Sequence, residues 1–206
     1  MKPRVAILIP TIGRASLAAA LESIKASWDG ERVIVLGQRD TAAAERIFDA
    51  VDPKVWLDGK PCWEFHALAD TDGGFGHDSR NWAIDHLVED GSYIASLDDD
   101  DVLLPGALDA FADAAFEGSP VSVFQTKWGP GHPANGVELY HQPVVVKGNI
   151  ATPMIFWRKC EARYGHSYFG DYELACALLD VYPANAWAWR DECVCEVRPV
   201  AVDEAA

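Results

Sequence analysis

Apolar runs alternate with amphipathic stretches through the first half of the chain. Residues 5–9 and 32–36 are near-continuous apolar runs, which predict strands of a parallel sheet that are buried on both faces. Helical spacing of Leu17, Leu21 and Ile24 predicts a helix between these runs, and residues 41–50 predict a second helix. This order is typical of right-handed crossovers, so the sequence predicts an α/β fold with a Rossmann-type, mainly parallel central sheet flanked by helices.

The pattern is less regular afterwards but continues to the C-terminus. Ser16 is expected to help cap the first helix, and Asp78 or Ser79 to cap a helix that runs to about residue 88. The remaining predicted elements are a short strand at 55–57, a glycine-rich loop at 72–76, a strand at 93–97, a helix around 108–115, a strand at 121–126, a loop at 128–136, antiparallel strands at 137–147 and 152–157, a helix at 171–179 and a strand at 193–197. With no long linker, residues 1–206 are expected to form a single domain with a small antiparallel element in its second half.

Four adjacent carboxylates, Asp98–Asp101, follow the apolar run at 93–97. In an open α/β sheet, ligands lie beyond the carboxyl ends of the strands. Adjacent acids there repel each other unless a cation or hydrogen-bond donors compensate, and oxygen-rich sites suit Mg²⁺, Mn²⁺ or Ca²⁺. The functional interpretation is a divalent metal that holds a phosphorylated ligand. The alternative is a solvated acidic loop before the helix that starts near Pro105 and Gly106.

Composition narrows the class of protein. The 206 residues are 50% hydrophobic and include eight Trp, as in a globular domain. The formal net charge of −15 argues against a protein whose affinity comes mainly from nucleic-acid phosphates. Five cysteines, an odd number, do not suggest a secreted disulfide framework. The apolar run at 5–9 is too short for a signal peptide, so a cytoplasmic protein is expected.

Four motifs occur in an order that resembles the family-two glycosyltransferases of the GT-A fold. They are Ile9-Pro10-Thr11-Ile12-Gly13-Arg14, Ser79-Arg80-Asn81-Trp82-Ala83-Ile84, Leu97-Asp98-Asp99-Asp100-Asp101 and Gly170-Asp171-Tyr172-Glu173-Leu174. The third matches the Asp-x-Asp element of that family. The resemblance covers roughly the whole chain and implies a GT-A-like fold, with a nucleotide-binding half at 1–104 and an acceptor-side half at 105–206.

The resemblance also implies an activity and a metal. Such enzymes move a sugar from a nucleotide-diphosphate donor to an acceptor hydroxyl, usually with inversion, and use Mn²⁺ or Mg²⁺ to offset charge on the leaving diphosphate. By the match, Asp100 is the first metal ligand. Asp98 contacts the metal, a metal-bound water or the ribose, Asp99 belongs to the nucleotide site, and Asp101 supports the site or caps the next helix.

Further nucleotide contacts follow from the same match. Thr11 and Arg14 lie at the nucleotide end, and Arg80 lies against the base or the diphosphate; the alternative for Arg80 is an ordinary surface ion pair. The family often places an Asp directly after the second strand to read the nucleobase. Here that place is Leu36-Gly37, and Asp40, the only Asp nearby, is therefore included in the predicted nucleotide site.

The resemblance places the catalytic base at Asp171, which would take the proton from the acceptor hydroxyl. The alternative is that Asp171 is only an N-cap. In place of the acid that precedes this base in the family, the chain has Gly170. Some members add a histidine to the metal, for which His141 and His166 are candidates; neither is included in the predicted metal site.

Two competing functions remain at this point. Asp98-Asp99-Asp100-Asp101-Val102 formally fits the nucleophile motif of haloacid-dehalogenase-like phosphatases, but that motif normally ends the first strand, and the later Gly-Asp-x-x-x-Asp of that family would need an Asp at Ala175. The other alternative is a sugar-nucleotide-binding protein without turnover.

Overall fold

A computed structural model describes residues 3–52, 54–57, 60–69, 76–136, 138–139 and 143–198. The described helices are α1 Leu17–Lys25, α2 Thr41–Val51, α3 His77–His86, α4 Ala107–Glu117 and α5 Gly170–Val181, with 3-10 turns at Thr152–Met154 and Ala184–Ala186. The described strands are β1 Val5–Thr11, β2 Arg32–Gly37, β3 Trp56–Leu57, β4 Lys60–Pro61, β5 Trp63–Ala67, β6 Tyr93–Ser96, β7 Val102–Leu103, β8 Val121–Trp128, β9 Glu138–Leu139, β10 Ile155–Arg158 and β11 Trp187–Val197.

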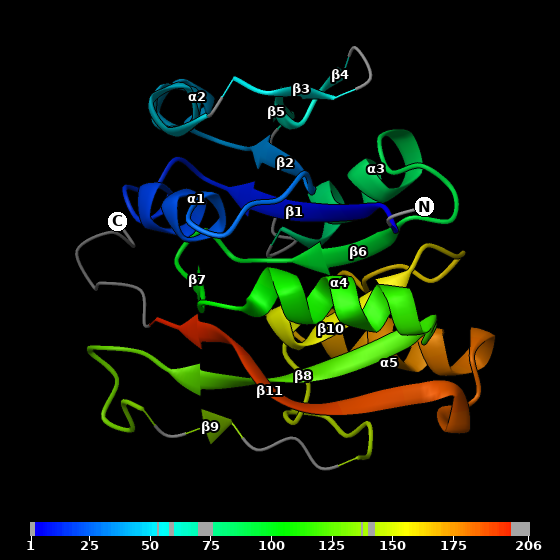
Figure 1. Cartoon of the computed structure of the whole chain (residues 1–206). Helices are drawn as coiled ribbons and strands as arrows, with labels where there is room; N and C mark the ends of the chain where they lie inside the picture. The colour runs from blue at the N-terminus through cyan, green and yellow to red at the C-terminus, as the bar shows by residue number, and fades with distance from the viewer. Residues whose placement is uncertain are drawn as a thin grey trace.

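One large sheet runs through the molecule in the order β5-β2-β1-β6-β10-β8-β11-β7, with β9 paired to β8 (Figure 1). Strands β5, β2, β1 and β6 are mutually parallel. Because β10 is antiparallel to both of its neighbours, β8 runs in the same direction as β6, and β11 is parallel to β8. The sheet is therefore mainly parallel, as the sequence predicts, and β7, β9 and β10 are its antiparallel members.

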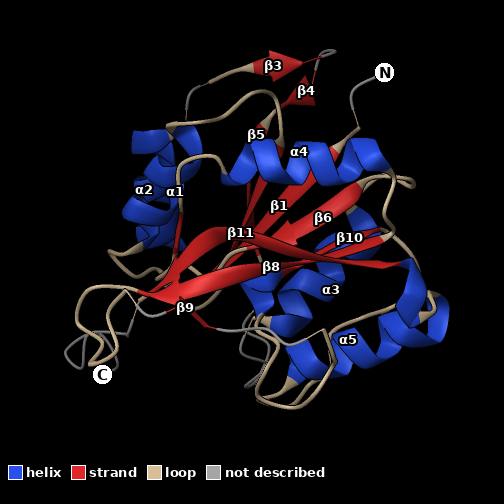
Figure 2. Cartoon of the chain, turned by 60° about the horizontal axis from the view of Figure 1, so that its bottom comes forward, coloured by secondary structure: helices blue, strands red, loops and turns tan. Residues whose placement is uncertain are grey.

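Helices cover both faces of this sheet. Helices α1, α2 and α4 lie on one face, and α3 and α5 lie on the other (Figures 1 and 2). Two apolar clusters fill the two interlayers, one built around β1 with α1 and α4, the other around Leu8, Ile34, Ile84 and Leu174. Alternate residues of β1 point to opposite faces, so the continuous apolar run of this strand serves both clusters.

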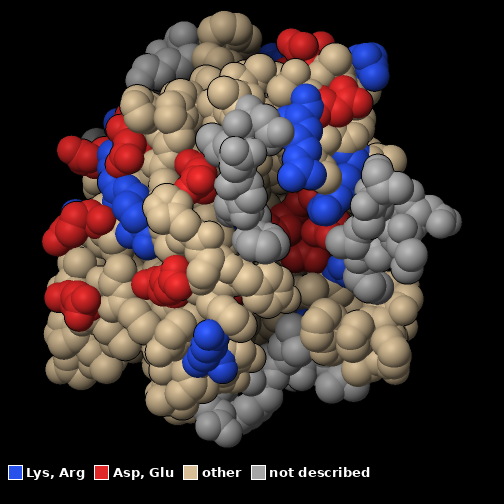
Figure 3. All heavy atoms as spheres, turned by 180° about the vertical axis from the view of Figure 1, so that it is seen from behind, with Lys and Arg blue, Asp and Glu red and all other residues tan. Residues whose placement is uncertain are grey.

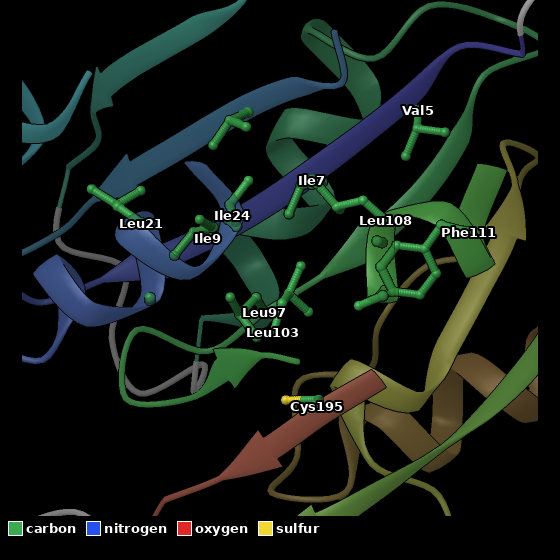
Figure 4. Packing of buried hydrophobic residues seen from close by; sticks show 14 of the residues in the cluster. Val5, Ile7, Ile9, Leu21, Ile24, Leu97, Leu103, Leu108, Phe111 and Cys195 are labelled. Carbon is green, nitrogen blue, oxygen red and sulfur yellow. The ribbon is translucent and has the colours of Figure 1, made fainter. Parts of the chain in front are cut away.

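The first of these clusters fixes the strand that leads to the acids (Figure 4). Ile7 and Ile9 of β1 pack with Ile24 of α1. Leu97, next to the acid stretch Asp98–Asp101, is fully buried in the same cluster as Leu103. Fully burying such a side chain stabilises the fold by about 1.5–3 kcal/mol. The backbone on both sides of Asp98–Asp101 is thus anchored by apolar side chains, which leaves the acids themselves at the edge.

Several sequence predictions of elements need correction. Residues 143–147 are not a strand, because Pro143 lacks an N–H for a ladder and the Asn149 N–H closes a turn onto the Val146 carbonyl at 3.1 Å. The predicted strand at 152–157 starts with a 3-10 turn and becomes β10 only at Ile155. Strand β5 was not expected, and β11 begins at Trp187, earlier than predicted. The loop predicted at 72–76 lies outside the described residues except for Gly76.

The predicted helix caps also differ from the structure. Ser16 already has helical dihedral angles and makes no cap hydrogen bond. Gly76, with φ of 78°, caps α3, so Asp78 and Ser79 lie in the first turn. Phe169 caps α5, which places Asp171 inside the helix. The alternative that Asp171 is an N-cap is therefore wrong.

Candidate functional site

The four acids lie at the carboxyl end of β6, a strand in the middle of the sheet between β1 and β10. The Leu97 N–H donates to the Leu8 carbonyl at 3.0 Å, which extends the pairing with β1 up to the acids. The Asp101 N–H then donates to the Asp98 carbonyl at 3.1 Å. This tight turn gathers four consecutive carboxylates at the edge where open α/β sheets bind ligands.

Three of the carboxylates meet closely enough to share a cation. Ligand oxygens of Asp98, Asp100 and Asp101 all lie within 4.8 Å of one another. Burial, followed by the charges of Asp98 and Asp99, raises the pKa of Asp100 to about 6. Burial and the charge of Asp98 also raise the pKa of Asp101 well above its usual value. Burial and mutual repulsion that raise the pKa values of Asp100 and Asp101 fit a site for a hard divalent cation, which would remove that repulsion.

Asp101 contributes more than the sequence predicts. Its side chain is buried, and its Oδ1 accepts the N–H of Arg198 at 2.9 Å, just past the end of β11. The resemblance gave Asp101 only a supporting or capping role, whereas the structure places it in the three-carboxylate group. This placement depends on the return of β11 from the far end of the chain, which residue spacing around Asp101 does not reveal.

Asp99 points to the other side, toward the loop after β1. Its Oδ2 accepts the Thr11 hydroxyl at 2.7 Å, and its Oδ1 accepts Arg14 Nη1 at 2.9 Å. The same Arg14 nitrogen also reaches Asp100 Oδ2 at 3.4 Å. Burial raises the pKa of Asp99, against the opposing effects of Thr11 and Arg14. The structure therefore brings Thr11, Arg14 and Asp99 together, with the Asp99 carboxylate buried beneath the site and engaged by protein donors.

Arg80 approaches the cluster from the opposite face of the sheet. Its side chain has no exposed surface, and Nη2 forms an ion pair with Asp98, whose side chain is 41% exposed. The guanidinium also lies over the ring of Tyr164, 5.4 Å from its centroid. The alternative of an ordinary surface ion pair is therefore wrong, because Arg80 is a buried charge directed at a partly exposed carboxylate.

Glycine at position 76 allows this approach. A Cβ there would lie 2.6 Å from Pro10 Cγ and 3.2 Å from Arg80 Nη1, and the positive φ is one that other residues rarely adopt. The start of α3 therefore packs directly against the end of β1. This contact brings Arg80 to the carboxyl edge, next to the acids of β6.

Asp171 lies in the first turn of α5, half-buried. Its Oδ1 accepts the Tyr172 N–H at 2.7 Å. Burial raises the pKa of Asp171; the Tyr172 N–H opposes this rise, and the charge of Asp98 adds to it. Since Asp98 and Arg80 both act on its protonation, Asp171 belongs to the same group of charges. A carboxylate with a raised pKa in that position is suited to accept a proton.

Other candidates lie at or beyond the margin of this group. Asp40 is exposed and caps α2, where its Oδ1 accepts the Ala43 N–H at 3.0 Å. His166 is 82% exposed, and its Nδ1 lies 2.6 Å from Asp78 Oδ1. His141 lies outside the described residues. His77 and Tyr164 are not among the site residues predicted from the sequence, although His77 precedes the second motif by two residues; no motif points to Tyr164.

The surface on the side of α3 and α5 has a hollow with Asp or Glu atoms in its floor and Lys or Arg atoms at its rim (Figure 3). Such a pattern is expected where carboxylates and arginines gather around a ligand site. Among the helices that the structure describes, none is long and apolar enough to cross a membrane.

Comparisons with known proteins bear on the fold. No protein-family model and no curated protein matches this sequence. Among solved structures, residues 1–349 of S. aureus TarS match 95% of this chain with a TM-score of 0.67 and 14% identity, and this chain spans only 60% of that one. Rv0371C of Mycobacterium tuberculosis H37Rv, solved in complex with manganese, matches 98% of this chain and 94% of its own, with a TM-score of 0.52 and 16% identity.

A further solved structure, a 4-diphosphocytidyl-2C-methyl-D-erythritol synthase, matches 93% of this chain and 90% of its own, with a TM-score of 0.56 and 13% identity. At such low identities these likenesses bear on architecture alone. Together with the strand order and the two helical layers, they show that the chain has the Rossmann-like fold that GT-A enzymes share with nucleotidyltransferases.

Proposed function

We propose that this protein is a metal-dependent glycosyltransferase that moves a sugar from a nucleotide-diphosphate donor to an acceptor hydroxyl, with inversion. One observation carries the proposal: Asp98, Asp100 and Asp101 form a three-carboxylate group at the carboxyl edge, and burial together with the charge of Asp98 raises the pKa of Asp171. In this proposal the group binds a cation and the diphosphate of the donor, and Asp171 acts on the acceptor. The manganese complex of Rv0371C, which shares the fold, is compatible with this assignment.

Each group of residues has a definite task in this reaction. Asp98, Asp100 and Asp101 hold Mn²⁺ or Mg²⁺, which, when bound, offsets the charge that develops on the departing diphosphate. Arg14, partly exposed beside Asp100, donates to phosphate oxygens. Arg80 orients Asp98 through their ion pair. Asp99, which itself accepts the Thr11 hydroxyl, holds Arg14 in place.

Asp171 completes the transfer. The acceptor oxygen forms a bond to the anomeric carbon while the bond from that carbon to the diphosphate oxygen breaks, and the bonding electron pair leaves with the diphosphate. Asp171 takes the acceptor proton as the oxygen attacks. Attack from the face opposite to the leaving group gives inversion.

The competing functions differ in what they need from the acid stretch. In a haloacid-dehalogenase-like phosphatase the nucleophile normally lies at the end of the first strand. Here β1 ends at Thr11, and the acids follow β6. A nucleotidyltransferase has the same fold but would release pyrophosphate from a nucleoside triphosphate. A binding protein without turnover needs the acid stretch but no proton acceptor at Asp171.

The first test is ligand-dependent stability. UDP, GDP, CDP and dTDP are screened with Mn²⁺ or with EDTA by thermal unfolding, since a ligand at a hundred times its dissociation constant adds about 2.7 kcal/mol. We expect at least one nucleotide to stabilise the protein only with Mn²⁺, and Asp100→Asn to abolish that shift. Asp113→Asn, on the exposed side of α4, is the matched control and keeps it.

The second test is turnover with a panel of nucleotide sugars and hydroxyl acceptors. Sugar transfer, or slow donor hydrolysis without an acceptor, supports the glycosyltransferase. Release of pyrophosphate from nucleoside triphosphates with sugar phosphates would identify a nucleotidyltransferase instead. Metal-dependent nucleotide binding without either reaction would leave a binding protein, and no metal-dependent binding at all would overturn the proposal.

A further inference from the structure

Asn81 of α3 binds the main chain of the loop that leads into α5. Asn81 Nδ2 donates to the Tyr164 carbonyl at 2.9 Å, and Asn81 Oδ1 accepts the Tyr164 N–H at 2.9 Å. The amide thus satisfies both main-chain polar groups of Tyr164, as a neighbouring strand would. A side chain that makes both bonds fixes the position and the orientation of that peptide segment.

Tyr164 is in turn held on three sides. Its ring stacks on His77 at a centroid distance of 5.2 Å and lies under Arg80, and its hydroxyl donates to Ser96 Oγ at 3.0 Å. Burial raises the pKa of Tyr164 to about 12, so the phenol stays protonated and remains a donor. Ser96 is the last residue of β6, two positions before Asp98. Tyr164 therefore contacts both the helix that carries Arg80 and the strand that carries the acids.

Further contacts hold the same loop between Tyr164 and Asp171. The Ser167 hydroxyl donates to Glu173 Oε1 at 2.6 Å, and the Gly170 N–H donates to the Ser167 carbonyl at 3.0 Å. Gly170 presses against α3 so closely that a Cβ would lie 2.4 Å from His77 Cδ2. Between Tyr164 and Asp171 the loop is thus tied to α3 at His166 and Gly170, and to the first turn of α5 at Ser167.

We propose that Asn81 is a positioning residue: by holding the main chain of Tyr164, it sets where Asp171 stands relative to Arg80 and Asp98. This inference rests on the proposed function, in which Asp171 is the base. Adjacent residues of α3 then serve the two substrates separately. Arg80 faces the charge of the donor site, and Asn81 places the group that acts on the acceptor.

The test compares Asn81→Asp with Asn185→Asp in full-length protein. Asp is nearly the size of Asn and still accepts the Tyr164 N–H, but its carboxylate has no proton to give to the Tyr164 carbonyl. Asn185, exposed in the 3-10 turn Ala184–Ala186, is the matched control. We expect amide hydrogen exchange in residues 164–171 to rise about tenfold in Asn81→Asp, as the loss of one hydrogen bond allows, and to stay unchanged in Asn185→Asp.

Kinetics separate positioning from general loosening. With the nucleotide sugar that the panel identifies, kcat should fall about a hundredfold in Asn81→Asp, since a misplacement of about 1 Å has that effect. The KM for the donor and the affinity for UDP with Mn²⁺ should stay within about twofold of wild type. Equal losses in kcat and in donor affinity, or a normal kcat, would overturn the inference.

A second variant separates the main-chain clamp, which is the pair of hydrogen bonds between Asn81 and the Tyr164 main chain, from the side-chain contact of the Tyr164 hydroxyl. Tyr164→Phe removes only the hydroxyl and keeps both bonds to Asn81, so its kcat should fall clearly less than that of Asn81→Asp. An equal loss would assign the effect to the Ser96 contact and refute the clamp. If the wild type shows no transfer, the proposed function fails, and the exchange measurement alone decides whether Asn81 fixes the loop.

Discussion

The two arginines at the acid stretch are held in opposite ways. Arg80 is fully buried, lies over the ring of Tyr164 and forms an ion pair with Asp98. Arg14 keeps 24% of its side chain exposed, donates to Asp99 at 2.9 Å and reaches Asp100 only at 3.4 Å. The second of these contacts is at the long limit for an N–H to oxygen bond and is correspondingly weak.

This difference separates a fixed charge from an exchangeable one. Arg80 cannot leave without exposing a cavity among His77, Tyr164 and Asp98, so it belongs to the permanent framework of the site. Arg14 can give up its contact with Asp100 and turn to a phosphate while its bond to Asp99 remains. We therefore expect changes on the Arg80 side to affect stability and catalysis, and changes on the Arg14 side to affect nucleotide binding.

The largest effect is expected for Asp171→Asn, on the Arg80 side. Asn cannot accept the acceptor proton, so the transfer rate should fall by roughly two to four orders of magnitude. Donor and metal affinity should stay close to wild type, because the base acts on the acceptor. The measurement is steady-state transfer together with UDP binding in Mn²⁺.

Asp180→Asn, exposed at the far end of the same helix, is the control for this change and should transfer normally. A near-normal rate in Asp171→Asn would remove Asp171 from the mechanism. Lost donor binding would instead move it to the nucleotide site and leave the inverting mechanism without its base.

The next effect concerns pH and His77, which is also on the Arg80 side. Burial, followed by the charge of Arg80, lowers the pKa of His77 from 6.5 to about 4. Above pH 6.5 the ring is neutral in both states. As the pH falls from 6.5 to 4, His77 takes up its proton in the unfolded chain before it does so in the folded protein. Its protonation therefore lowers the free energy of unfolding by up to about 3 kcal/mol.

The check is the difference in unfolding free energy between wild type and His77→Gln, measured from pH 7 to pH 4. The stability advantage of the wild type should shrink on acidification, while contributions of the acid stretch are common to both proteins and cancel. His86→Gln, exposed on the same helix, is the control for the removal of a histidine from α3. A difference that is constant with pH would mean that His77 is not a buried neutral ring.

The third prediction compares the two arginines directly. Arg80→Met roughly keeps the volume but loses the bond to Asp98, so unfolding should become easier by about 2 kcal/mol, as for other bonds to charged groups. Arg14→Met should cost less than about 1 kcal/mol, as for partly exposed ion pairs. Nucleotide affinity should fall more in Arg14→Met than in Arg80→Met, the reverse of the order expected for stability. Chemical denaturation and UDP titration measure the two quantities, and equal stability losses would remove the distinction between fixed and exchangeable arginines.

Much of this arrangement was predictable from the sequence. The apolar runs gave the strands next to the site, and the end of one run gave the position of the acids at the carboxyl edge. Both follow from local pattern, because burial on two faces requires continuous apolar residues. Asp98, Asp100 and Arg80 were identified in this way or through the resemblance, and the structure brings them together.

The rest depends on contacts between segments far apart in the chain. Asp101 joins the acid group because β11 returns beside it, and Tyr164 enters because Asn81 binds its main chain, 83 residues away. Buried polar partners have no periodicity to reveal them. The N-cap alternative for Asp171 is wrong for a related reason. Phe169 occupies the N-cap position of α5 because the contacts of Ser167 with Glu173 and with the Phe169 N–H fix the loop before the helix, and local propensity does not decide the position.

The smallest effect tests how far the nucleotide site extends on the Arg14 side. Asp40 caps α2 and lies against the Gly13 loop, where a Cβ on Gly13 would be 2.6 Å from the Asp40 carbonyl oxygen. Asp40→Ala should cost about 1 kcal/mol of stability, and Asp40→Ser should recover most of it, since Ser also caps helices. Because the carboxylate is used in the cap, UDP affinity in Mn²⁺ should change less than about twofold in both variants. A marked loss of affinity in Asp40→Ser, with stability restored, would show instead that the carboxylate contacts the nucleotide, and would extend the site from Arg14 to the end of β2.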